Sequence, residues 1–181
     1  MNIIEIFTKS LFLIISFDND LWEIIILSLY VSIFALIVAS IFGLLIGYYI
    51  ALKNFPFKSF ILIVLNSLMG IPPVVVGLIV YFFFASGGPL GVLQLLYTPT
   101  AMIIAQIIII FPIVTSISHE IFDQNWREFK DQLRSINMPF FGVAFIITKH
   151  SYFLVITALL SAFGRAISEV GAVMIVGGNI D

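Results

Sequence analysis

Cysteine is absent from this chain of 181 residues, and histidine occurs only twice, as His119 and His150. A chain without cysteine cannot form a disulfide, a cysteine-ligated zinc site or an iron–sulfur cluster. Two histidines are too few for a histidine-rich metal site, and we predict no metal centre. Charge is scarce as well, because Asp, Glu, Lys and Arg make up only 10% of the residues. A soluble domain of this size needs a far more charged surface.

A phosphate-binding loop of the Gly-x-x-x-x-Gly-Lys-Ser/Thr type is also missing, so we expect no ATP or other cofactor on this chain. An intramembrane enzyme would have to use His119 or His150 with a nearby serine. Both histidines lie beside charged residues at the edges of apolar segments, and no nucleophile motif accompanies them. We therefore do not predict an enzyme, while a passive channel stays open as an alternative to a driven transporter.

Apolar sequence is what the chain has in abundance. Hydrophobic residues make up 61% of it, which is typical of helices that cross a bilayer. The charge-free stretches predict an all-α, polytopic membrane helix bundle, with residues 1–181 as a single domain. The first 21 residues are too short and too charged to span, and we expect an interfacial helix there, followed by Trp22 at the membrane interface. The four predicted spans are 24–52, 60–85, 98–118 and 151–176.

Basic residues are concentrated on one side of the predicted bundle. Lys9 falls on the other side and Arg165 within a span, but six of the eight lie in the turn after the first span or in the polar segment 119–150. By the positive-inside rule, this segment is a cytoplasmic loop and the N-terminus is outside. The six residues are Lys53, Lys58, Arg127, Lys130, Arg134 and Lys149.

Within this loop the sequence predicts a helix over 126–136. Asn125 and Glu128 have the spacing of a capping box, with Asn in place of Ser or Thr. Asn137 can adopt the left-handed conformation that ends a helix, and Pro139 follows it. One face is apolar and the rest is charged, so the helix either lies on the membrane or docks a soluble partner. The apolar face comprises Trp126, Phe129, Leu133 and Ile136.

The first predicted span carries a small residue at every fourth position. Such a stripe lets helix backbones approach closely in lipid, where packing drives association. We predict close packing within the bundle, with a dimer interface as the alternative. The stripe consists of Ala35, Ala39, Gly43, Gly47 and Ala51.

The second predicted span is interrupted by Pro72 and Pro73, which lie between Gly70 and Gly77. Two adjacent prolines remove two backbone donors and break the helical ladder. In lipid, such a break needs neighbouring protein or a water-filled cavity to satisfy the freed carbonyls. We therefore expect this segment to face the bundle interior, either as a structural kink or as part of a translocation path.

The last predicted span contains two charges, Arg165 and Glu169, which are neighbours on one helix face. Charges at this depth cost ~2.5–3.5 kcal/mol each on insertion scales, so they require an explanation. We predict an ion pair. It either locks the bundle or takes part directly in an anion path. Ser161, Ser168 and Ala172 line up with Arg165 at helical spacing.

Four stretches of the chain carry a family resemblance, and they lie at 67–78, 88–91, 97–106 and 163–180. The first contains Gly-Ile-Pro-Pro-Val-Val-Val-Gly, and the last, Phe-Gly-Arg-Ala-Ile-Ser-Glu-Val-Gly-Ala and beyond, is the most specific. In these motifs the chain resembles the tungstate-type permease subunits of ATP-binding-cassette importers, relatives of the molybdate and sulfate permeases. The resemblance covers nearly the whole chain.

The resemblance implies a MetI-like permease fold and import of tungstate, with molybdate, another oxyanion or another small solute as alternatives. It also implies two permease copies, an extracytoplasmic oxyanion-binding protein, and two cytoplasmic ATPase subunits that hold ATP and Mg²⁺. Membrane lipid surrounds this complex, and no nucleic acid takes part. Alternating access is then driven by the ATPase pair, and selectivity between oxyanions lies in the binding protein.

Members of the family carry a coupling loop that seats in a groove of the ATPase, with an acidic residue, two small residues and then a glycine. Here Asp131 takes the place of the acidic residue and Asn137 that of the glycine. Asparagine can replace glycine at this point because both residue types tolerate a left-handed turn. The residues expected at the ATPase contact are Glu128, Asp131, Arg134, Ser135 and Asn137.

Members of the family also continue past Gly177 and Gly178 with an outer loop and one more span. This sequence ends at Asp181. We therefore expect the final span to be missing, either because the sequence is a fragment or because the protein lacks that helix.

Overall fold

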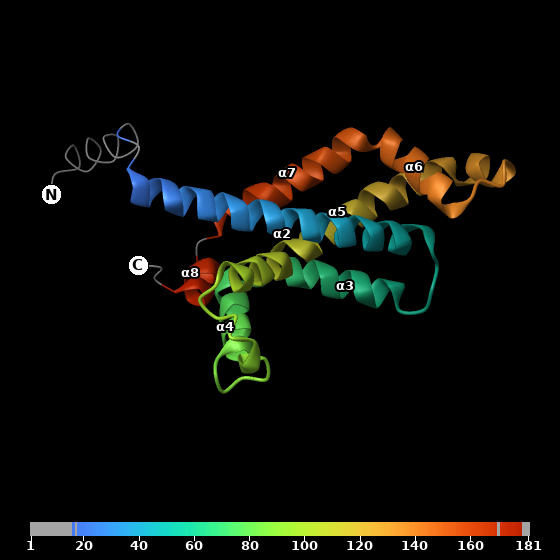
Figure 1. The fold of residues 1–181 in the computed structure, drawn as a ribbon. Coiled ribbons are helices and arrows are strands. Elements are labelled where there is room, and N and C mark those ends of the chain that lie inside the picture. The colour runs from blue at the N-terminus through green and yellow to red at the C-terminus, as the bar shows by residue number, and fades with distance from the viewer. Residues whose placement is uncertain (1–15, 17, 170, 179–181) are drawn as a thin grey trace.

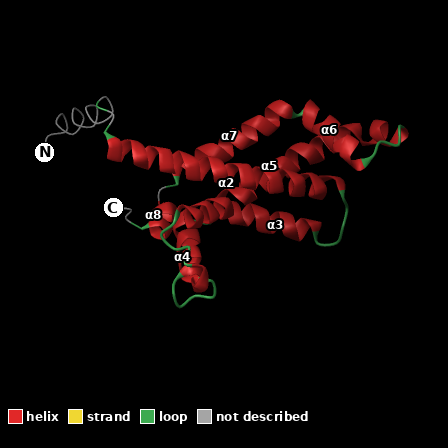
Figure 2. Ribbon diagram, in the orientation of Figure 1, coloured by secondary structure: helices red, strands yellow, loops and turns green. Residues whose placement is uncertain are grey.

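The computed structural model describes residue 16, residues 18–169 and residues 171–178. Most of the predicted N-terminal interfacial helix lies outside these described residues. Within them every regular element is a helix (Figures 1 and 2), which confirms the all-α bundle. The helices are α2 (Asn19–Leu52), α3 (Lys58–Met69), α4 (Pro73–Phe84), the 3-10 helix η1 (Gly91–Leu93), α5 (Pro99–Ser135), α6 (Phe140–His150), α7 (Tyr152–Ser168) and α8 (Gly171–Gly177).

Two long helices, α2 and α5, pack against each other through the middle of the molecule (Figure 1). All five residues of the small-residue stripe on α2 are buried. An added Cβ at Gly43 would lie 2.9 Å from the Val114 side chain, and one at Gly47 would lie 2.9 Å from the Thr115 carbonyl oxygen. A side chain at either position would force its neighbours to shift, so the prediction of close packing within the bundle is confirmed.

The helix that contains the third predicted span, 98–118, continues well beyond it. α5 begins after the Thr98 cap and runs unbroken to Ser135, with Pro112 inside it. The charges that follow residue 118 occupy only part of the helix surface, because Phe122 and Asn125 continue its buried face. Packing on that face carries the helix well past the point where the first charge appears.

Two other predicted spans are divided. α3 and α4 meet at an angle of 100° within the predicted span 60–85, and the predicted span 151–176 is split because α7 ends at Ser168. Residues 119–150, predicted as a loop, are mostly helical, since they comprise the end of α5 and all of α6. α6 and α7 meet at 78°. Within the described residues two helices, α2 and α5, can cross a membrane alone, and counting each bent pair as one span gives four.

The end of the bundle that holds α6 has its own apolar core. The Tyr48 hydroxyl donates to the Phe140 carbonyl at 2.9 Å, and its ring packs edge-on against Phe122 with centroids 5.6 Å apart. Leu133 near the end of α5 and Ile147 of α6 are buried in the same cluster. This core fixes the end of α5 and the start of α6 against α2.

Large apolar side chains remain uncovered on the outer faces of the helices. Ile24 on α2 is 63% exposed, Phe60 on α3 is 63% exposed and Phe153 on α7 is 68% exposed. Continuous apolar surfaces of this kind suit lipid or another subunit rather than water.

Candidate functional site

α5 ends in a fully hydrogen-bonded turn that leads into α6. The Asn137 N–H donates to the Arg134 carbonyl at 3.0 Å, and the Met138 N–H donates to the Leu133 carbonyl at 3.2 Å. These two bonds form a Schellman motif, and Asn137 has the left-handed backbone that the motif requires, with φ 48°. Met138 packs against the cluster that buries Leu133, and Pro139 then caps α6. The predicted helix end at Asn137 is confirmed.

This end of α5 presents both charged and apolar side chains away from the core. Leu133 is buried, but Ile136, predicted on the same apolar face, is 62% exposed. Phe141, in the first turn of α6, is 82% exposed. Arg134 lies over the Trp126 ring, with Cζ 5.5 Å from the ring centroid. The predicted coupling residues are all exposed here: Glu128, Asp131, Arg134, Ser135 and Asn137.

Asn125 does not cap a separate helix, and the predicted helix start there is wrong. Asn125 is 7% exposed inside α5, and its Nδ2 donates to the Ile121 carbonyl one turn earlier at 2.7 Å. An Asn side chain can bond to the backbone of its own helix as well as cap a helix, so spacing alone does not separate the two cases. The consequence is that the exposed turn belongs to one continuous helix of 37 residues.

The helix break lies at Gly70–Pro72, between α3 and α4. Gly70 ends α3, Pro72 caps α4, and Pro73 occupies its first position, where a missing N–H costs nothing. Gly70 and Pro72 are exposed on the single chain and Pro73 is half-buried, so the break is not enclosed by this chain's own helices. The expectation that these residues face the interior of the bundle is not met within one copy.

Gly77, which we grouped with the break, lies inside α4 and is buried. An added Cβ there would lie 2.9 Å from the Ala172 Cα of α8. Its position shows close packing of α4 on α8.

Arg165 and Glu169 form the predicted ion pair, with Nη2 and Oε1 2.8 Å apart. The Glu169 side chain is 9% exposed and that of Arg165 is 39% exposed. Glu169 has an extended backbone and ends α7, so the pair closes over a helix end rather than lying within a continuous span. Ser168 is exposed and donates to a carbonyl of its own helix, whereas Ala172 is buried in α8, so the predicted line of small residues does not form one face.

Gln106 is a buried polar residue that sequence reasoning did not single out. It is 1% exposed in α5, and its Nε2 donates to the Ala166 carbonyl of α7 at 3.0 Å. Ala166 lies in the last turn of α7, and its carbonyl also accepts from the Glu169 N–H at 3.3 Å. Gln106 therefore supports the helix end that carries the Arg165–Glu169 pair. A lone glutamine in an uncharged span was the available signal.

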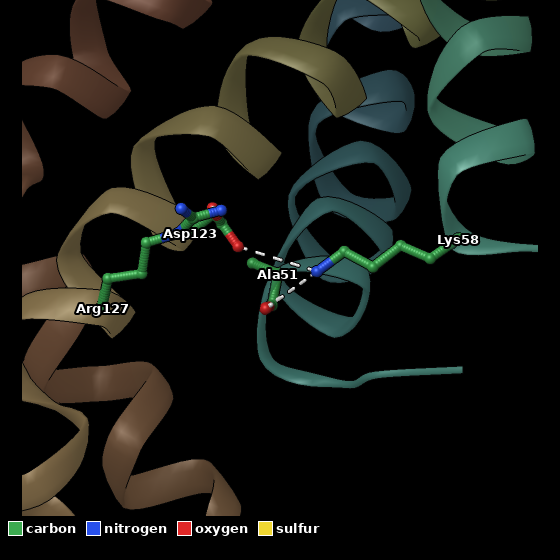
Figure 3. A network of polar contacts seen from close by, with 4 residues as sticks. All are labelled: Ala51, Lys58, Asp123 and Arg127. Carbon is green, nitrogen blue, oxygen red and sulfur yellow. Dashed lines mark hydrogen bonds and ion pairs between the residues drawn. The ribbon is translucent and has the colours of Figure 1, made fainter. Parts of the chain in front are cut away.

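A second polar cluster, also missed, joins three helices (Figure 3). Lys58, the first residue of α3, places Nζ 3.6 Å from Oδ1 of Asp123 on α5 and donates to the Ala51 carbonyl of α2 at 3.4 Å. Oδ2 of Asp123 accepts from Arg127 of the same helix at 2.8 Å. Lys58 and Asp123 are distant in sequence, so no local sequence pattern predicts their contact.

Comparison with known proteins identifies the architecture. Residues 39–180 match the family described as binding-protein-dependent transport system inner membrane component. The chain is also 39% identical over 178 residues to the tungstate uptake system permease protein TupB of Peptoclostridium acidaminophilum, which covers 98% of this chain and 78% of that relative. The chain belongs to this family. The MetI-like permease fold expected from the resemblance is thereby confirmed.

Two further relatives of the permease are more distant. The tungstate uptake system permease protein TupB of Campylobacter jejuni is 30% identical over 174 residues, covering 96% of this chain and 73% of the relative. The sulfate transport system permease protein CysW of Escherichia coli K12 is 27% identical over 180 residues, covering 90% of this chain and 58% of the relative. The permease thus spans less than two thirds of the sulfate relative.

Family membership accounts for the apolar surfaces and for the exposed turn. The permease is a membrane-spanning transport subunit of the ATP-binding-cassette type, and its family is not itself catalytic. A subunit of this type must receive motion from a partner, and the turn between α5 and α6 is an exposed, ordered and charged element on which a soluble partner could act.

Proposed function

We propose that the chain is the translocating subunit of an importer for tungstate or a similar oxyanion such as molybdate. The observation that carries the proposal is the 39% identity to a tungstate permease over 98% of the chain. The exposed turn between α5 and α6 supports it, because a driven transporter needs a surface on which an ATPase can act. A passive channel has no such requirement.

In the proposed complex, two copies of the chain work with two cytoplasmic ATPase subunits and an extracytoplasmic oxyanion-binding protein. ATP and Mg²⁺ are held by the ATPases. The turn between α5 and α6 lies in the cytoplasm and docks in the ATPase through its exposed face, which includes Asp131, Arg134 and Ile136. The segment 53–58 with its two lysines lies at the same end of the bundle (Figure 1), which supports that orientation by the positive-inside rule.

The direct test is uptake of tungstate, molybdate and sulfate, detected by mass spectrometry, in cells with and without the gene. We expect tungstate uptake to require the gene, to stop when cellular ATP is depleted, and to compete with molybdate more strongly than with sulfate. Uptake that persists without ATP would favour the channel. If cells without the gene lost sulfate uptake to the same extent as tungstate uptake, the assignment to tungstate would be wrong.

The docking surface is tested by charge reversal. Asp131→Lys or Arg134→Glu should abolish uptake and the part of ATPase activity that the binding protein stimulates, with near-normal amounts of the chain in the membrane. Both side chains are exposed, and exposed charges contribute little to folding, so Asp131→Lys should act mainly on docking. Arg134→Glu also removes the contact with the Trp126 ring. Asp131→Glu is the matched control and should retain uptake. Normal uptake in both reversal variants would show that coupling uses another surface.

A further inference from the structure

α3 is held in place by few apolar contacts. Of its twelve residues, all of them described, only Leu65 is buried. Large side chains on the same helix, such as Phe60 and Ile63, are each 63% exposed. In lipid, helices are held together by packing contacts and hydrogen bonds, and a helix with one buried residue makes few packing contacts. Polar contacts to its neighbour α5 therefore carry more weight here than they do elsewhere in the bundle.

Two polar contacts join α3 to α5. One is the ion pair between Lys58 and Asp123, whose side chains are only 20% and 19% exposed (Figure 3). The other is a short hydrogen bond from the Ser116 hydroxyl to Oδ1 of Asn66. The two contacts are about two helical turns apart on each helix. Their order along the two helices is reversed, so α3 and α5 run in opposite directions.

Between these contacts an open pocket of about 540 Å³ lies along α3 and α5. His119 and Glu120 of α5 line it together with Asn66 and Asp123. An open pocket of this kind leaves few interlocked side chains to resist a shift of one helix against the other. The Lys58–Asp123 pair closes the pocket at the end nearest the turn between α5 and α6.

We infer that the Lys58–Asp123 ion pair makes α3 follow the movement of α5, so that both residues are positioning residues for coupling ATP hydrolysis to transport. The inference rests on the proposed function and adds to it a connection that lies outside the docking surface. Asp123 belongs to the same continuous helix as the exposed turn, and Lys58 is the first residue of the helix that leads to the break at Gly70–Pro72. A displacement of the turn therefore moves α5, and the Lys58–Asp123 contact passes that displacement to α3 and so to the break.

Arg127 provides a matched control that the molecule itself supplies. It also pairs with Asp123, at 2.8 Å, but it lies on α5 one turn away and therefore does not join α5 to α3. Removing Arg127 leaves Asp123 to Lys58, whereas removing Lys58 leaves Asp123 to Arg127. Both variants remove a positive charge from the same acceptor, but only the loss of Lys58 breaks the connection between α5 and α3. Removing Lys58 also removes its contact with the Ala51 carbonyl of α2, a contact that does not involve Asp123, so Asp123→Asn tests the ion pair separately.

The experiment uses the complete complex of permease, ATPase and binding protein in proteoliposomes, with tungstate as the transported anion. The quantity measured is the number of anions transported per ATP hydrolysed. We expect Lys58→Gln and Asp123→Asn each to lower this ratio by about fivefold or more, the size of a modest coupling free energy, while ATP hydrolysis continues. The double variant should be no worse than either single variant, and Lys58→Arg and Arg127→Gln should keep the native ratio.

An unchanged ratio in Lys58→Gln, or an equal loss in Arg127→Gln, would overturn the inference. Absence of both tungstate and molybdate transport by the wild-type complex would instead refute the proposed function. A second measurement leaves Lys58 and Asp123 unchanged, so it does not depend on whether their variants fold. Because the chain has no cysteine, Ser59→Cys and Gln124→Cys can carry a pair of nitroxide labels in the otherwise native complex. Their separation should stay constant between the nucleotide-free and ATP-bound states, and a change of several ångströms would show that α3 and α5 move independently.

Discussion

At the scale of single residues, glycines separate positions that need close approach from positions that do not. An added Cβ at Gly77 would meet the Ala172 backbone, whereas one at Gly164 would have nothing within 4 Å. We expect Gly77→Ala to destabilise the chain by ~1–3 kcal/mol, the usual cost of overpacking. Gly164→Ala should leave stability unchanged or raise it by ~0.5–1 kcal/mol, because glycine is unfavourable inside a helix. Thermal unfolding of both variants in the same detergent measures the difference, and equal losses would contradict the packing described for α4 and α8.

The Arg165–Glu169 pair makes a different prediction. Because the Glu169 side chain is 9% exposed, removing its partner leaves a nearly buried carboxylate without compensation. Arg165→Ala and Glu169→Ala should each lower the melting temperature and the amount of chain in the membrane. The double variant Arg165→Met with Glu169→Met should do so less than either single variant. A double variant clearly less stable than both singles would show that the two charges do not act as a pair.

At the scale of elements, the turn after α5 depends on one backbone conformation. Asn137 has φ 48°, which glycine adopts freely, asparagine tolerates and β-branched residues resist. Asn137→Gly should therefore keep the stability of the chain, whereas Asn137→Val should cost ~1–2 kcal/mol and reduce transport along with it. Melting temperatures of the two purified variants give the comparison, and a valine variant as stable as the glycine variant would contradict the left-handed turn.

Structural features that depend on residues close together in the sequence could be predicted. The stop at Asn137 and Pro139, the break at Pro72 and the close approach along α2 each follow from residues within one or two turns of one another. The Arg165–Glu169 pair could be predicted for the same reason. The family itself became visible once these local motifs occurred together.

Features that depend on contacts across the bundle could not. Charged residues after residue 118 were interpreted as the end of a span, but Asp123 and Arg127 occupy one side of α5 while Phe122 packs beneath Tyr48 on another. Asn125 was assigned to a helix cap because the sequence does not show that its side chain is buried. The Lys58–Asp123 pair joins helices whose neighbouring positions are set only by the fold.

For the whole molecule, the orientation in the membrane is open to a direct chemical test. The absence of native cysteine makes single-cysteine labelling clean. With the N-terminus outside, Gly87→Cys, in the exposed loop after α4, should react with a membrane-impermeant maleimide in intact cells. Gln124→Cys, exposed on α5, should react only after the cells are opened. Labelling of Gln124→Cys but not Gly87→Cys in intact cells would reverse the proposed topology.

The unbroken length of α5 makes its last turns part of one rigid body. At ~1.5 Å of rise per residue, the turn at Ser135 lies ~25 Å along the helix axis from the close contact between Ser118 and Gly47, and Asp123 lies ~8 Å from it. The apolar core around Tyr48 and Phe122 holds this stretch of α5 against α2. A displacement imposed at the turn would therefore move α2 and α5 together, and the α3 contact at Asp123 would move with them.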